Sequence, residues 1–409
     1  MDKACLYCVI VGWCGLALLG GAAGAEGEAT TSSMVRWKVV AELPKLEGQQ
    51  KAGLAGVFAG ALDDRRLLVA GGTFYEDKGP LEGGMRSFSD RMLVLSQAPG
   101  AAGAEPAYSW KPMETTLPRP LAYGASVTLE DGVLLIGGTD GIVCVPDVRW
   151  VRWDQTTDQL VVSEFPALPK PLAYLGAGRV GHWVLAVGGT TSPDGMSGAD
   201  VFGLDLTRRE NGREFNWQSL SAMPVAAHFP IVVGEAGEEG RWLHVFGGRD
   251  LRPGEEGRVL SEGWRFDPAA RTWTSTGPIA PEKKGGPGVA LMGGAAVALE
   301  QGRLLVLGGD DGRLARLMED NGQHRGPIEE RESYARLNAA MLAAHPGHRR
   351  AQLLYDAKIE AWRSAGHFPG PTPAVTPAFL WDGAVVLVGG EPAPGRRSAN
   401  VWLGSLESE

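Results

Sequence analysis

The sequence has 409 residues, of which 44% are hydrophobic and 21% are charged, so it contains enough apolar side chains for a large core and differs from a disordered chain. The formal net charge of −9 argues against nucleic acid as a partner, because binding to phosphates needs a basic surface. The 59 glycines favour many short strands joined by tight turns.

The first predicted element is a signal peptide over residues 1–25. Lys3 precedes an apolar run that ends at a small-x-small site, Ala23-Gly24-Ala25, so we expect cleavage before Glu26. The alternative is an uncleaved membrane anchor, which the glycines within the run disfavour. We therefore expect a secreted protein with no membrane attachment after cleavage.

Cys144 is the only cysteine that follows this segment. A disulfide within the mature monomer and a thiolate metal cluster are thereby excluded. An exported chain without disulfides favours a bacterial periplasm as its location. The histidines show no metal-ligand spacing beyond the weak pair His345 and His348, so we expect neither a metal nor another cofactor.

The rest of the chain contains a repeat, an apolar strand that ends in Gly-Gly. The second glycines of these doublets are Gly72, Gly138, Gly189, Gly248, Gly309 and Gly390. They are 66, 51, 59, 61 and 81 residues apart, and about 40–50 residues suffice for four short strands with their turns. Each interval therefore predicts one four-stranded propeller blade with some longer loops.

A second signature keeps step with the first: a tryptophan strand that runs into a proline turn. It occurs from Trp37 to Pro44, Trp110 to Pro118, Trp217 to Pro224, Trp273 to Pro278 and Trp362 to Pro369, and in the second blade an apolar strand from Leu160 leads to Pro166. Each blade then reads as inner strand, Gly-Gly strand, third strand and tryptophan strand. We expect the tryptophans to cover the gaps between neighbouring blades.

The register also predicts how the ring closes. The last blade has an inner strand near 374–381, a Gly-Gly strand and a third strand at 400–403, but no fourth strand follows. The N-terminal tryptophan strand, 36–42, is the unassigned one, so we expect it to complete the last blade. The sequence thus predicts an all-β fold, a six-bladed Kelch-type β-propeller over 34–409.

One interval is long because it holds a predicted helical insertion, about 328–355, after the fifth Gly-Gly doublet. Glu, Arg, Ala and Leu recur there at helical spacing until Pro346-Gly347 breaks the pattern. This insertion is interpreted as a lid, as a partner surface or as a solvated decoration.

Candidate chemistry lies in the loops after the doublets, which open on one face of a propeller. Glu391 follows the sixth doublet directly, and Arg396 and Arg397 return on the same loop. A carboxylate that faces guanidinium groups can act as a general base while they hold an anion, although the same residues can form a purely structural pair.

Other charged residues share this predicted face. Arg86 follows the first doublet and Arg119 precedes the next inner strand, so both are candidates for binding a substrate. Further loop charges are Asp140, Arg249, Asp250, Asp310 and Asp311. Any one of them alone is more often a solvated charge than a ligand contact.

The insertion followed by the loop GGEPAPGRRS resembles the N-acetylneuraminate epimerases (sialic acid mutarotases), secreted six-bladed Kelch propellers of bacteria. The similarity extends to KAGLAGVFAG, EGGMRSFSD and RPLAYGAS, and the loop keeps the family's acid and arginine six positions apart, at Glu391 and Arg397. In familiar members the segment equivalent to 37–95 follows this loop. The chain therefore resembles the cyclically permuted group of the family.

The resemblance implies a function and roles for the loop residues. It implies that the protein interconverts the anomers of N-acetylneuraminate, a small acidic sugar, without a cofactor. Glu391 is implied as the catalytic acid/base and Arg397 as its support, and the guanidinium of Arg397 is suited to a bidentate pair with the sugar carboxylate. The alternatives are a non-catalytic propeller that binds a glycan or a protein, and a mutarotase for another acidic sugar.

Overall fold

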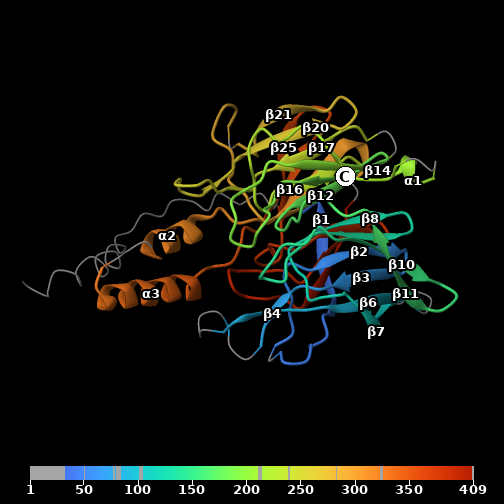
Figure 1. Cartoon of the computed structure of the whole chain (residues 1–409), viewed down its shortest axis with the longest axis horizontal. Helices are drawn as coiled ribbons and strands as arrows, with labels where there is room; N and C mark the ends of the chain where they lie inside the picture. Colours follow the sequence, from blue (N-terminus) through green and yellow to red (C-terminus); the bar gives the residue numbers. More distant parts are fainter. Residues whose placement is uncertain are drawn as a thin grey trace, which may run out of the picture. The chain divides into compact units, whose positions relative to one another are not determined.

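The computed structural model describes residues 33–49, 51–76, 79, 84–100, 105–210, 214–237, 240–281, 283–322 and 326–407, and the predicted signal peptide lies outside these ranges. Within them the chain forms six four-stranded antiparallel sheets, which confirms the predicted β-propeller (Figure 1). Among the described residues, no helix is both long enough and apolar enough to cross a membrane.

The first three blades follow the chain in order from the inner strand outward. Blade one consists of β2 (Phe58–Asp63), β3 (Arg66–Ala70), β6 (Arg91–Ala98) and β7 (Ala107–Thr116). Blade two consists of β8 (Ala125–Leu129), β9 (Gly132–Ile136), β10 (Val148–Asp154) and β11 (Gln159–Phe165). Blade three consists of β12 (Gly176–Val180), β13 (Trp183–Val187), β14 (Val201–Asp205) and β15 (Gln218–Ser219).

The last three blades repeat this arrangement, and the sixth takes its outer strand from the N-terminal side. Blade four consists of β16 (Ile231–Gly234), β17 (Leu243–Phe246), β20 (Glu262–Asp267) and β21 (Thr272–Pro278). Blade five consists of β22 (Ala295–Ala298), β23 (Arg303–Leu307), β24 (Ala351–Asp356) and β25 (Ala361–His367). Blade six consists of β26 (Ala378–Trp381), β27 (Ala384–Val388), β28 (Asn400–Leu406) and β1 (Val35–Glu42). The tryptophan strand β1 pairs with β28 from Val35 opposite Leu406 to Glu42 opposite Asn400.

The insertion differs from the predicted range of 328–355. It comprises two helices, α2 (Arg313–Gly322) and α3 (Ile328–Ala343), which pack side by side (Figure 1). The helical part begins earlier because Leu, Leu and Met recur in RLARLMEDNG at helical spacing. The apolar run AQLLYD at the end of the predicted range, after the break at Pro346-Gly347, is strand β24 of blade five.

Smaller elements decorate the loops. Two ribbons were not predicted, β4 (Thr73–Tyr75) with β5 (Arg86–Phe88), and β18 (Arg249–Asp250) with β19 (Arg258–Val259). Both ribbons start directly after a Gly-Gly doublet. Short helical turns are α1 (Thr207–Glu210) and the 3-10 helix η2 (Glu300–Gly302).

The tryptophan strands hold neighbouring blades together. The indole Nε1 of Trp110 in blade one donates to Glu42 O in blade six at 2.6 Å, and that of Trp273 in blade four donates to Ser221 O at the edge of blade three at 2.9 Å. Trp37 likewise donates to Gln352 Oε1 of blade five at 3.0 Å. Each of these indoles therefore combines apolar packing with one bond to the preceding blade, as the periodicity predicted.

The Gly-Gly doublets are required by close contacts between blades. At Gly71, a Cβ atom would lie 2.2 Å from the carbonyl oxygen of Leu121, which belongs to the next blade, and the backbone φ is +64°. The neighbouring Gly72 donates its N–H to the same oxygen at 2.8 Å. Only glycine fits a position with both a positive φ and so close a carbonyl.

Six residues close a hydrogen-bonded ring around the propeller axis. This axial ring takes one residue from the segment that leads into each inner strand: Gly56, Tyr123, Tyr174, Phe229, Gly293 and Val375. Each N–H donates to the carbonyl of its neighbour in the ring, at 2.7–3.0 Å. All six have φ between 49° and 66°, the left-handed region in which side chains are uncommon. The ring satisfies its own backbone groups and forms a rigid floor across the channel.

Candidate active site

The propeller places one residue pair of each blade on the same face. In each blade the residue before the ring position forms an antiparallel bridge with the residue after the Gly-Gly doublet. These bridge pairs are Ala55 with Thr73, Ala122 with Thr139, Ala173 with Thr190, His228 with Arg249, Met292 with Asp310 and Ala374 with Glu391. Blades one to three thus carry alanine and threonine, whereas blades four to six carry titratable groups.

A cavity of about 490 Å³ lies on the axial ring, within the ~300–1,000 Å³ range of small-molecule sites. Its floor includes Tyr123, Tyr174 and Phe229, whose rings pack with centroids 4.8–6.2 Å apart. Its wall carries the polar residues Arg86, Asp194, His228, Asp310, His348 and Glu391 among apolar residues such as Met196, Leu251 and Met292. The cavity therefore has an aromatic floor, and its wall carries positively and negatively charged side chains. This combination suits a polar ring-shaped ligand.

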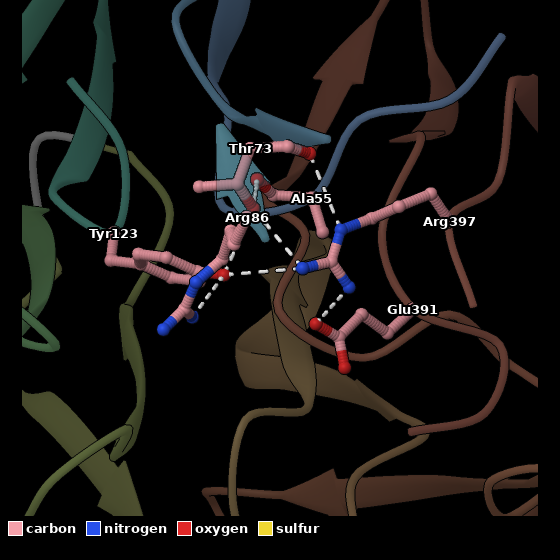
Figure 2. A network of polar contacts seen from close by, with 6 residues as sticks. All are labelled: Ala55, Thr73, Arg86, Tyr123, Glu391 and Arg397. Carbon is pink, nitrogen blue, oxygen red and sulfur yellow. Dashed lines mark hydrogen bonds and ion pairs between the residues drawn. The ribbon is translucent and has the colours of Figure 1, made fainter. Parts of the chain in front are cut away.

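Glu391 and Arg397 form a partly buried ion pair at this wall (Figure 2). Arg397 Nη1 donates to Glu391 Oε1, and the side chains are 7% exposed for Arg397 and 19% for Glu391. The pair that the sequence placed on one loop is thus formed at the axial cavity. Glu391 lines the cavity, whereas Arg397 lies behind it.

The remaining donors of Arg397 are held by blade one and by the ring. Its Nε donates to Thr73 O at 3.3 Å, and its Nη2 contacts Thr73 Oγ1 at 3.2 Å and the Tyr123 hydroxyl at 3.5 Å. All three of its nitrogens therefore have protein partners. The expected bidentate pair of Arg397 with a ligand carboxylate stays a prediction.

Arg86 is the guanidinium that faces the cavity. It lies at the start of β5, is exposed, and its Nη1 donates to the Tyr123 hydroxyl at 3.1 Å (Figure 2). Tyr123 also contacts Thr73 Oγ1 at 2.9 Å, so Thr73 and Tyr123 link Arg86 to Arg397 through one polar network. Arg86 retains further donors for an anion, since a guanidinium has five N–H groups.

Two histidines, His228 and His348, also line the cavity. The sequence singled out His348 only as a weak metal-ligand pair with His345, and it did not single out His228. The imidazole Nδ1 of His348 lies 3.7 Å from Asp310 Oδ2. The backbone N–H of His348 donates to Pro392 O on the glutamate loop at 2.8 Å. Burial lowers the pKa of His348, while Asp310 and Glu391 oppose that shift. Burial also lowers the pKa of His228, to about 4. His228 could have been recognised from the sequence because it occupies the bridge-pair position at which four other blades have alanine.

The other predicted binding residues lie away from the cavity wall. Arg119 is 48% exposed and its Nη1 is 3.9 Å from Asp140 Oδ2. Arg396 is drawn to the helical insertion, where its Nη2 donates to Ala343 O at the end of α3 at 3.2 Å. Arg249 makes a second link to the insertion, since its Nη2 contacts Glu319 of α2 at 2.6 Å. The insertion is thus attached to the loops of blades four and six, and the binding roles of Arg119 and Arg396 stay predictions.

Fold and site together define a class: a six-bladed Kelch-type propeller with an acid–guanidinium pair in its axial cavity. The chain matches the sequence model of the N-acetylneuraminate epimerases over residues 21–161 and 165–409, and it belongs to that family.

The sequence identity to individual members of the family is low. The N-acetylneuraminate epimerase of Yersinia pestis (strain Pestoides F) is 28% identical over 250 residues, which cover 60% of this chain and 58% of that protein. The N-acetylneuraminate epimerase of Pasteurella multocida (strain Pm70) is 24% identical over 251 residues, covering 60% and 59%. The matched segment thus covers less than two thirds of the length of each of these relatives.

A solved structure shows a similar fold. The structure of YjhT superimposes with a TM-score of 0.57 at 14% identity, covering 90% of this chain and 97% of that chain. At this identity the similarity supports the propeller architecture alone.

Proposed function

We propose that this protein accelerates the interconversion of the α and β anomers of free N-acetylneuraminate, as an isomerase that needs no cofactor. The observation that carries the proposal is the Glu391–Arg397 pair at the wall of the axial cavity, in a chain of the epimerase family. The relatives bear the name of this activity.

Mutarotation needs proton transfer at two oxygens of the sugar. Glu391 takes the proton of the anomeric hydroxyl, the bond from the anomeric carbon to the ring oxygen breaks, and the protonated Glu391 delivers this proton to the ring oxygen. Rotation of the open-chain keto acid then presents the other carbonyl face, and the reverse transfers close the ring. General acid–base catalysis of this kind contributes ~10²–10⁴-fold.

The geometry suits Glu391 to this task. Arg397 holds Oε1, so the carboxylate has a defined orientation and its other oxygen points away from the guanidinium (Figure 2). Since Nε, Nη1 and Nη2 of Arg397 each already have a protein partner, we assign the sugar carboxylate to Arg86, which faces the cavity and donates one hydrogen bond, to Tyr123. Arg397 then acts as a positioning residue for Glu391.

We also propose that the protein works outside the cytoplasm, in a bacterial periplasm after removal of residues 1–25. The signal-peptide pattern and the single cysteine that follows it support this location.

Cys144 is buried, and burial raises the pKa of its thiol to about 11, so the thiol is a poor nucleophile at neutral pH.

Proton NMR tests the activity directly. The α anomer of N-acetylneuraminate, freshly released, is followed with and without the protein as it approaches the β anomer. We expect a faster approach with the protein, and loss of most of that acceleration in Glu391→Gln, which retains a hydrogen-bonding partner for Arg397. Equal rates with and without the wild-type protein would end the proposal and leave a propeller that only binds a sugar or a protein.

A further inference from the structure

His228 occupies a position that the fold does not reserve for histidine. The bridge-pair partners at this place are alanine in four blades, namely Ala55, Ala122, Ala173 and Ala374, and methionine, Met292, in the fifth. The bridge itself uses only backbone atoms: His228 N donates to Arg249 O, and Arg249 N donates to His228 O, both at 2.8 Å. The imidazole is therefore an addition to the repeat rather than a part of it.

The hydrogen bonds of Ser197 determine the tautomer of this imidazole. Ser197 Oγ lies 2.6 Å from His228 Nδ1, 2.8 Å from Arg249 O and 2.8 Å from Leu251 N. Leu251 N–H is a donor and Arg249 O is an acceptor, so the single hydroxyl proton goes to Arg249 O. His228 Nδ1 must then carry a proton and donate to Ser197 Oγ. Its Nε2 consequently has an unprotonated lone pair.

This lone pair belongs to a histidine of the cavity wall. His228 lines the same cavity as Arg86 and Glu391, and within the described part of the chain its Nε2 has no hydrogen-bond partner. Burial and the nearby Arg249 keep the imidazole neutral at physiological pH, with a pKa of about 4. Nε2 is thus a permanent acceptor in a wall whose neighbouring groups include the donors of Arg86 and the carboxylates of Asp310 and Glu391.

We propose that His228 Nε2 accepts a hydrogen bond from an N–H or O–H group of the sugar, remote from the carboxylate that Arg86 holds. This inference rests on the proposed function, because it places an acidic sugar in the cavity. Arg86 belongs to blade one and His228 to blade four, which are opposite blades of the six-bladed ring, so a sugar whose carboxylate is held by Arg86 can direct its other end toward the imidazole. His228 is therefore a binding residue that selects for a donor at that end, and it takes no part in proton transfer.

The test compares three variants by calorimetry and by the NMR assay with N-acetylneuraminate. His228→Ala removes the acceptor and introduces the residue that four blades already have, so we expect it to fold. We expect its Kd and KM to rise about tenfold with kcat changed less than ~twofold. His228→Gln returns an acceptor oxygen and should recover most of the affinity. His182→Ala, whose side chain is 54% exposed on another loop, is the matched control and should leave both constants unchanged.

Two analogues identify the donor. One has a hydrogen atom in place of the acetamido group, and the other has a shortened glycerol side chain. For the analogue that lacks the donor, wild type and His228→Ala should bind equally, whereas the other analogue should keep the tenfold difference. Equal Kd values for wild type and His228→Ala with N-acetylneuraminate, or a loss confined to kcat, would overturn the inference. Binding that depends on His228 without faster mutarotation would reject the proposed function and leave this contact standing, and no binding at all would reject both.

Discussion

Blades one to three and blades four to six have the same strands but differ at the bridge pairs on the cavity face. In blades two and three the threonine after the doublet bonds within its own loop: Thr139 Oγ1 donates to Val143 O at 2.7 Å and Thr190 Oγ1 to Ser192 O at 3.0 Å. In blades five and six, Asp310 and Glu391 at the same place line the cavity. Because one backbone arrangement accepts all of these side chains, a departure from the repeat is a better indicator of the site than any single charge.

The strongest change in rate should come from giving blade six the residue of the first three blades. Glu391→Thr removes the proposed acid/base and should lower the rate of anomer interconversion by ~10²–10⁴-fold, measured by proton NMR. Thr139→Ala, at the equivalent place in blade two, loses only loop hydrogen bonds and should keep its rate while unfolding at lower urea concentration. A rate for Glu391→Thr within about tenfold of wild type would remove this position from the mechanism.

The second prediction concerns stability in acid. The pKa of His228 is about 4 in the folded protein against an ordinary value of 6.5, so the unfolded chain binds the proton more readily. This contribution is fully present above pH 6.5 and is lost as the pH falls toward 4, and it amounts to about 3 kcal/mol. His228→Ala carries the residue of blades one to three and should lack this dependence. Urea unfolding at about pH 7 and about pH 4.5 measures the difference, and parallel losses in both proteins would contradict the assignment.

The third prediction concerns Arg86, the exception to the comparison, since it lies in blade one and still faces the cavity. Arg86→Gln should raise KM for N-acetylneuraminate about tenfold to a hundredfold, because a hydrogen bond to a charged group contributes roughly 1.5–3 kcal/mol. The control is Arg36→Gln, whose side chain is 80% exposed at the edge of blade six. An unchanged KM for Arg86→Gln would mean that another group holds the sugar carboxylate.

The weakest effect is expected at Val375 of the axial ring, at the position where blades one and five have glycine. Val375 is a β-branched residue at φ 53°, a conformation that costs it roughly 1–2 kcal/mol. Val375→Gly relieves this strain but loses partly buried surface, so the free energy of unfolding should change by less than ~1 kcal/mol. Tyr123→Gly loses a buried ring and its bonds to Thr73 and Arg86, and should cost more than ~3 kcal/mol. A loss of more than about 1 kcal/mol for Val375→Gly in urea titrations would show that strain at Val375 is negligible.

Much of the fold was predictable from the sequence because its signals are local and repeated. Each Gly-Gly doublet combines a positive φ with a close neighbouring carbonyl, and the tryptophan strands cover blade boundaries. The insertion was located, but α2 was overlooked because it lies before the predicted range of 328–355. The ribbon β4–β5 was missed since three-residue strands carry too few side chains to show a period.

For the candidate site, the sequence singled out Glu391, Arg397 and Arg86, which the structure joins through Tyr123 and Thr73. It did not single out His228, because that residue belongs to no motif of its own and is recognised only when the six blades are superimposed. The bridge pairs that make this superposition possible are contacts between residues that lie apart in the chain.

The number of blades, the order of strands within each blade and the loop that holds Glu391 and Arg397 all follow from the amino-acid sequence alone, because glycine, tryptophan and proline act through local geometry. The direction of the charged side chains does not. Arg86 faces the axial cavity and Arg396 turns to α3, although both follow a Gly-Gly doublet on the same face. A loop side chain takes its direction from partners in other blades, and these partners come together only when the ring closes.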